Sequence, residues 1–100
     1  MEKNSKEKEI EVSGDMTIYE AGEIRELFNN AIANNDSINV NLSNVSEIDS
    51  SGIQLMVALK KKAASEDKTV SFISHSSAVV GLLDLFDLTS LFGDPIVMEK

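Results

Sequence analysis

The chain has 100 residues, which suits a single domain. Its 17 acidic residues against 9 basic ones give a net charge of −8, which argues against nucleic acid and against an anionic membrane surface as partners. It contains no cysteine, so disulfides, thiolate catalysis and zinc–cysteine sites are excluded. No apolar run approaches the roughly 20 residues of a membrane span, and the charged start lacks a signal peptide's apolar region, so we expect a cytoplasmic protein without direct membrane insertion.

The N-terminal part predicts a tail followed by two short strands. Residues 1–9 are charged and nearly free of apolar side chains, so we expect a disordered or frayed tail there and a single domain over 10–100. Residues 10–13 alternate apolar and polar side chains, which predicts a half-buried strand. Gly14 and Asp15 are typical of a turn, and residues 16–18 predict a strand that returns beside the first as a hairpin.

A helix is predicted next, because the apolar period changes at residue 21 and polar residues 34–36 end the pattern. Its expected buried face consists of Ala21, Ile24, Leu27, Phe28, Ala31 and Ile32. Residues 37–42 alternate and predict a strand, and residues 43–50 are expected to be a polar connection.

The C-terminal half predicts two further helices. One helix is expected from about Ser51 to Ala64, a strand over 69–73, a third helix from about Ser77 to Phe86, and an edge strand over 96–98. Alternating strands and helices imply crossovers and a largely parallel sheet, which the first hairpin would make mixed. The sequence therefore predicts a small α/β sandwich with a mixed sheet of four or five strands and about three main helices. A sandwich of this size has little room for an active-site cleft, which argues against an enzyme.

The segment 47–54 links a predicted strand region to a helix, at the end of a sheet where α/β proteins place functional groups. Asp49, Ser50 and Ser51 are all residue types that cap helices, and Gln54 completes a capping box with Ser51. One interpretation is that these residues serve only to start the helix.

The other interpretation is a phosphorylation site. A helix N-terminus can hold a phosphate, yet a phosphoserine beside Asp49 and Glu47 would add about −1.5 to −2 charges to an acidic surface. The small residues Ser51 and Gly52 would leave the loop open to a kinase. A modified serine would then be accommodated in its own domain and rejected at an interface.

At this loop the chain resembles the STAS family, small cytoplasmic α/β domains that include bacterial anti-sigma-factor antagonists. The sequence 49–52, Asp-Ser-Ser-Gly, matches that family's phosphorylation-loop motif. The likeness extends over roughly residues 10–93, and the similar segments are 14–21, 39–42, 53–59, 70–79, 83–88 and 91–92.

The resemblance implies that Ser50 is the phosphoacceptor of a partner-switching module in bacterial signal transduction. In the antagonists the unphosphorylated form binds a Ser/Thr protein kinase that is also an anti-sigma factor, phosphorylation ends the association, and a Ser/Thr phosphatase restores it. Asp49, Ser51, Gly52, Ile53 and Met56 are the expected loop and partner-binding residues, together with the 60–62 end of the helix.

Thr17 departs from the sigma-linked members, which commonly carry an acid there and act in transcription regulation. The run 14–21 is more similar to STAS proteins associated with chemotaxis or other signalling systems. Other STAS domains imply an alternative from a different class, a non-catalytic subunit of a membrane transport complex such as an ABC-type lipid transporter.

A hydrolase is the third hypothesis, in which Ser50 or Ser51 would act with His75 and with Asp49 or Asp84. No nucleophile elbow surrounds any serine, no second His or Cys accompanies His75, and no nucleotide-binding motif is present, so we expect no catalytic residue, metal or cofactor. The surplus of apolar residues over 79–92 is read as cover for the end of the sheet, with a partner surface or a weak homodimer as the other interpretation.

Overall fold

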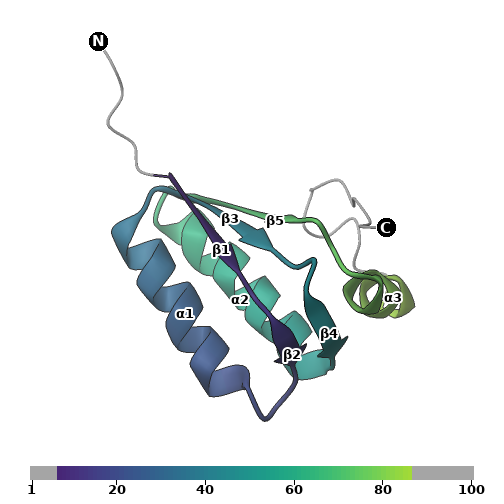
Figure 1. Cartoon of the computed structure of the whole chain (residues 1–100). Helices are drawn as coiled ribbons and strands as arrows, with labels where there is room; N and C mark the ends of the chain where they lie inside the picture. The colour runs from purple at the N-terminus through teal and green to yellow at the C-terminus, as the bar shows by residue number, and fades with distance from the viewer. Residues whose placement is uncertain (1–6, 87–100) are drawn as a thin grey trace.

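The computed structural model describes residues 7–86, which form five strands and three helices (Figure 1). Their order is β1 (Glu7–Glu11), β2 (Gly14–Met16), α1 (Ala21–Asn34), β3 (Ser37–Asn41), β4 (Val45–Ile48), α2 (Ser50–Ser65), β5 (Thr69–Ile73) and α3 (Ser77–Leu85). The α/β class and the three helices expected from the sequence are confirmed. β1 begins at Glu7, inside the segment expected to be a tail, while the expected edge strand over 96–98 lies outside the described residues.

The strands form a three-stranded sheet in the order β1-β3-β5 and a separate pair, β2-β4. Every pairing among the described strands is parallel. The expected hairpin of the first two strands is therefore wrong. Gly14 has φ +90 and bends the chain, but Val12 N donates to Asn41 O at 3.1 Å and Gly14 N to Asn44 O at 3.0 Å. The chain consequently continues alongside the third strand instead of folding back on the first.

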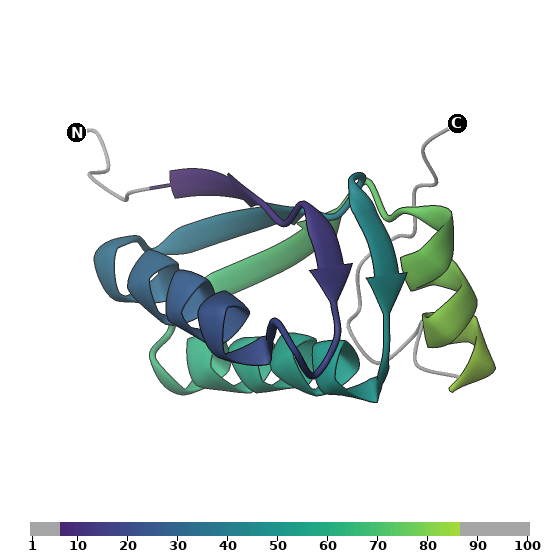
Figure 2. The ribbon, with the colours of Figure 1, turned by 60° about the horizontal axis from the view of Figure 1, so that its bottom comes forward.

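The polar connection expected over 43–50 is also wrong, because β4 occupies its middle, residues 45–48. Its burial pattern is irregular: Val45 is buried, and Ser46 and Glu47 are exposed. β2 and β4 lie side by side and turn away from the larger sheet toward the start of α2 (Figure 2). The smaller sheet therefore ends where α2 begins.

The helices pack at two separate locations on the strands. α1 and α2 lie side by side on one face of the three-stranded sheet, and α3 packs against β4 (Figures 1 and 2). The core between sheet and helices includes the rings of Phe28 and Phe72, whose centroids are 6.4 Å apart. Leu27, expected on the buried face of α1, is 36% exposed. None of the described helices combines the length and the apolar character needed to cross a bilayer.

Candidate functional site

Asp49 organises the loop between β4 and α2. Its backbone is extended, and its Oδ1 accepts a hydrogen bond from Ser51 N at 2.8 Å, which makes Asp49 the N-cap of the helix. Its Oδ2 accepts a second hydrogen bond, from Ile18 N at 3.1 Å, and its own N–H donates to Met16 O at 3.3 Å. One carboxylate thus joins the start of α2 to the loop that follows β2.

Ser50 is the first residue of α2 and is exposed. Because Asp49 supplies the cap, the Ser50 hydroxyl is not needed to begin the helix. The capping box expected between Ser51 and Gln54 does not form: Ser51 lies inside the helix, half-buried, and its backbone donates to Asp49. Among Asp49, Ser50 and Ser51, Ser50 is therefore the residue that is exposed to solvent and does not cap the helix.

Gly52 allows α2 to approach β2 closely. A Cβ at this position would lie 2.5 Å from Met16 O and 2.8 Å from Ile48 Cγ1, closer than atoms can pack. The glycine of the Asp-Ser-Ser-Gly run is therefore required by packing of the helix start on the ends of the two short strands. Gly52 affects the loop indirectly, because the close packing that it permits determines how near Ser50 and Ser51 lie to β2.

The loop between β2 and α1 forms the other side of the site. The backbone N–H and Oγ1 of Thr17 donate to Glu20 Oε1 at 3.1 and 2.5 Å, which closes a tight turn. Ile18 and Tyr19 follow in this turn with 62% and 90% of their surface exposed. Sequence reasoning missed both, because it placed Ile18 in a strand and gave Tyr19 no role. An apolar pair between a strand and a helix was the only available signal.

The surroundings of Ser50 are acidic. β2 and β4 pair Asp15 with Glu47, each one residue before the end of its strand. Asp49 and Glu20 follow in the two adjoining loops and are half-buried. A further negative charge on Ser50 would therefore add to an existing concentration of carboxylates.

The structure corrects two of the expected contact residues. Ile53 and Met56 are 4% and 0% exposed, so their side chains belong to the core and are not available to a partner. The face of α2 that packs on the sheet cannot be the face that meets a partner.

The lysines at the end of α2 also lie away from the loop. Lys60 Nζ donates to Val70 O at 2.6 Å, which holds this side chain against β5, and Lys62 pairs with Glu66 at 3.7 Å. At 1.5 Å rise per residue, Lys60 is about 15 Å along the helix from Ser50. These lysines are therefore not part of the Ser50 site.

His75 is only 1% exposed and lies in the turn between β5 and α3, where Ser76 Oγ caps the helix by accepting from Val79 N at 3.3 Å. A buried imidazole does not face the exposed Ser50 hydroxyl, and Asp84 is exposed on α3. The geometry gives no support to a catalytic triad. Within residues 7–86, no three His, Asp or Glu side chains are grouped so as to hold a metal ion.

Comparison with known proteins identifies the family of this chain. The family model described as "Mlab, STAS domain" matches residues 1–97, while no curated protein matches the chain. Among solved structures, the chain is similar to the "Structure of the Anti-Sigma Factor Antagonist SpoIIAA in its Unphosphorylated Form", with a TM-score of 0.72 and 19% sequence identity over 99% of this chain and 85% of that one. At this identity the likeness concerns the fold. Because the family model covers nearly the whole sequence, the chain belongs to the STAS domain family and has the fold of an anti-sigma-factor antagonist.

Proposed function

We propose that this STAS domain is a non-catalytic, phosphorylation-gated protein-binding module in bacterial partner switching, with Ser50 as the phosphoacceptor. The observation that carries the proposal is the division of roles at the start of α2: Asp49 caps the helix, and the neighbouring Ser50 is exposed without that duty. A kinase can therefore reach the hydroxyl, and modification leaves the cap intact.

The charge of the loop explains why modification would end binding. A phosphoserine at the first position of a helix is stabilised by the helix dipole and by unpaired backbone N–H groups. It would nevertheless add to the carboxylates of Asp15, Glu47 and Asp49 at a surface that a partner must desolvate. The phosphorylated form is thus stable as a domain and unfavourable as a ligand.

The exposed Ile18 and Tyr19 supply the apolar part of the same surface. Ile18 N is hydrogen-bonded to Asp49, so the apolar pair and the phosphoacceptor lie on either side of one carboxylate. Aromatic residues are common at the energetic centre of interfaces. We place the partner contact here, in place of the buried Ile53 and Met56. The expected partners are a Ser/Thr protein kinase of the anti-sigma type and a cognate phosphatase.

The test is a pull-down from native lysate with Ser50→Ala and Ser50→Asp proteins as parallel baits, read by mass spectrometry. A Ser/Thr-type kinase should be recovered with alanine and lost with aspartate. Ser77→Asp is the matched control, because Ser77 is the exposed first residue of α3 and receives the same charge at the same helix position elsewhere. Loss of the kinase with Ser77→Asp as well would reduce the effect to total charge, and equal recovery with both Ser50 variants would end the proposal.

A non-catalytic subunit of a membrane transport complex is the second candidate. It is compatible with the exposed Tyr19, since a side chain that is 90% exposed suits a permanent contact as well as a switched one. The same pull-down distinguishes the two: an ATPase or permease recovered equally with Ser50→Ala and Ser50→Asp would assign the domain to a transport complex.

A further inference from the structure

The residues from Thr17 to Glu20, between β2 and α1, form a turn in which each backbone N–H group donates a hydrogen bond. The N–H of Thr17 donates to Glu20 Oε1 at 3.1 Å, that of Tyr19 to Thr17 Oγ1 at 3.4 Å, and that of Glu20 to Thr17 O at 3.0 Å. The N–H of Ile18 donates to Asp49 Oδ2 at 3.1 Å. The turn is thus closed on itself by its own hydrogen bonds, and the bond to Asp49 joins it to the loop before α2.

Glu20 is the residue whose side chain closes this turn. Its Oε1 accepts hydrogen bonds from both Thr17 N at 3.1 Å and Thr17 Oγ1 at 2.5 Å. Although Glu20 occupies the N-cap position of α1, its side chain makes no capping hydrogen bond to that helix. Its hydrogen bonds therefore serve the conformation of the turn and not the start of the helix.

The two middle residues of the turn project from it, since Ile18 is 62% and Tyr19 is 90% exposed. Their N–H groups are already hydrogen-bonded, so an anionic group of a partner finds no free backbone donor at either residue. Recognition of the turn must therefore use its side chains. A projecting aromatic ring of this kind is matched by a concave apolar pocket on the partner.

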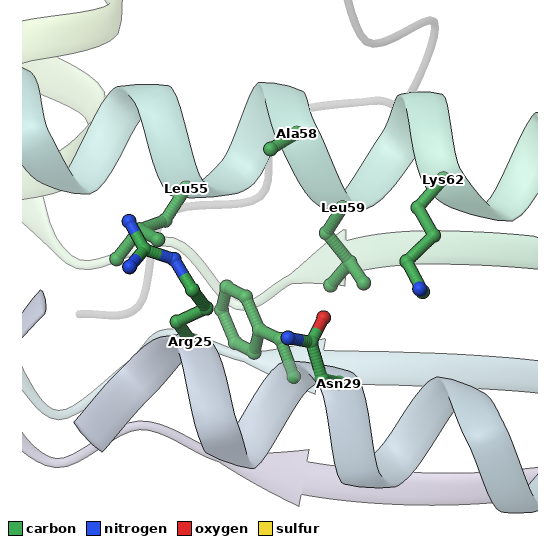
Figure 3. Close-up of a pocket in the computed structure, with 7 residues that line it drawn as sticks. Arg25, Asn29, Leu55, Ala58, Leu59 and Lys62 are labelled. Carbon is green, nitrogen blue, oxygen red and sulfur yellow. The ribbon is translucent and has the colours of Figure 1, made fainter. Parts of the chain in front are cut away.

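The hollow between α1 and α2 offers no equivalent apolar contact. It measures about 140 Å³, and Figure 3 shows Arg25 extending from α1 toward Leu55 of α2. The large apolar residues that line it, Phe28, Leu55 and Leu59, are 2%, 7% and 3% exposed, so they belong to the core. The turn that holds Tyr19 is therefore the apolar contact that a partner can reach at this site.

We infer that Glu20 is a positioning residue of the partner-binding surface, which fixes the turn so that Tyr19 is presented to an apolar pocket of the partner. A turn that is already ordered loses little conformational entropy on binding, so more of the free energy from burial of the tyrosine ring is retained as affinity. This inference rests on the proposed function and deepens it, because it names what the partner presents and which residue prepares the contact.

The test is a double-mutant cycle in the full chain carrying Ser50→Ala, with the partner recovered by that bait, once purified, as the probe. Tyr19→Ser alone should weaken binding about tenfold or more. Glu20→Ala alone should weaken binding about fivefold, because the turn must then be ordered on binding. In the chain that carries Glu20→Ala, the further loss from Tyr19→Ser should fall to about threefold or less, because a positioning residue and the residue that it positions are not additive.

Two further variants separate geometry from charge. Glu20→Gln keeps an oxygen that can accept both hydrogen bonds from Thr17, so its affinity should stay within about twofold of the original value. Glu23→Ala is the matched control, because it removes an exposed carboxylate in the first turn of the same helix and should change affinity by less than about twofold. A loss with Glu20→Gln or Glu23→Ala equal to that with Glu20→Ala, or additive losses in the cycle, would overturn the inference.

Amide hydrogen exchange, followed by NMR, tests the turn without any partner. Glu20→Ala should speed exchange of the Thr17 and Tyr19 amides about tenfold or more and leave the amides of α3 unchanged, whereas Glu20→Gln should leave both sets unchanged. Thr17→Val, which removes the hydroxyl and keeps Glu20, should speed exchange of the Tyr19 amide as Glu20→Ala does. Unchanged exchange in both Glu20→Ala and Thr17→Val would overturn the inference.

These outcomes are distinct from failure of the proposed function. If Ser50→Ala and Ser50→Asp recover the same partner, then phosphorylation gating fails, and the cycle measured with that partner still decides the role of Glu20. If gating holds and Tyr19→Ser leaves the affinity unchanged, then Tyr19 is not a contact and the positioning role of Glu20 is refuted.

Discussion

The carboxylate of Asp49 is shared between two loops, because its Oδ2 lies 3.1 Å from Ile18 N while its Oδ1 caps α2. A side chain that a sequence presents as a simple helix cap is thus also a tertiary contact between the loops after β2 and β4. This arrangement leaves Ser50 chemically available and holds Ile18 and Tyr19 beside it.

Replacement of Asp49 should therefore cost more than an ordinary cap. Asp49→Ala removes both hydrogen bonds, and we expect the free energy of unfolding to fall by about 1–3 kcal/mol. Asp49→Asn retains one acceptor oxygen and should lose less. The measurement is urea unfolding followed by circular dichroism. Ser76→Ala, which removes the side-chain cap of α3, is the control, and a loss no larger than that of the control would contradict the two-loop role.

Gly52→Ala should destabilise the domain by about 1–3 kcal/mol, because the added Cβ would lie 2.5 Å from Met16 O and force α2 away from β2. Gly81→Ala is the matched control. Gly81 is an exposed helical residue in α3 with no atom within 4 Å of the position of a Cβ, so alanine there should stabilise by about 0.5–1 kcal/mol. Opposite signs in thermal or urea unfolding would support the packing role, and equal signs would refute it.

Ser50→Ala should leave the free energy of unfolding within about 0.5 kcal/mol of the original value, because the residue is exposed and does not cap the helix. The same unfolding measurement applies, with Ser76→Ala as a contrast, since Ser76 caps α3 and should cost about 1 kcal/mol. If Ser50→Ala lowers the free energy of unfolding as much as Ser76→Ala does, then Ser50 has a structural role.

Tyr19→Ser should weaken partner binding about tenfold or more and leave stability within about 0.5 kcal/mol, because the side chain is 90% exposed. Binding is measured with the partner recovered by the Ser50→Ala bait. The control is Leu85→Ser, which removes an apolar side chain that is 74% exposed on α3. Loss of binding with Leu85→Ser and not with Tyr19→Ser would place the contact on α3.

Much of the fold could be predicted from local patterns. The helix from Ala21 to Asn34, the strand over 69–73 and the third helix follow from the spacing of apolar residues, which reports the face each element buries. β4 was missed because its four residues include only two apolar side chains, at Val45 and Ile48, which fit no regular period. The hairpin was wrongly expected because Gly14 signals a bend but not the strand that the chain meets after it.

The part of the site that lies in one continuous stretch of sequence was also predictable. Ser50 and Asp49 could be identified because the loop residues are adjacent in the sequence. Ile18 could not, since it reaches the site through the hydrogen bond of its N–H to Asp49, which is 31 residues away in the sequence. Ile53 and Met56 were expected to contact a partner, but they lie on the face of α2 that packs on the sheet, and apolar periodicity alone does not state whether a sheet or a partner covers a face.

The parallel pairing of the strands also bears on how the domain folds. Glu7 pairs with Ser37, and Ser37 with Thr69, so neighbouring strands come from segments about thirty residues apart. Among the described strands no hairpin offers a nearby nucleus, and the loop entropy of each crossover must be lost before its strand contacts form. The helices can form early from local contacts, whereas the sheet, and with it the joint of Asp49 to Ile18, must assemble late. We therefore expect the surface proposed to bind a partner to be among the last parts of the molecule to form.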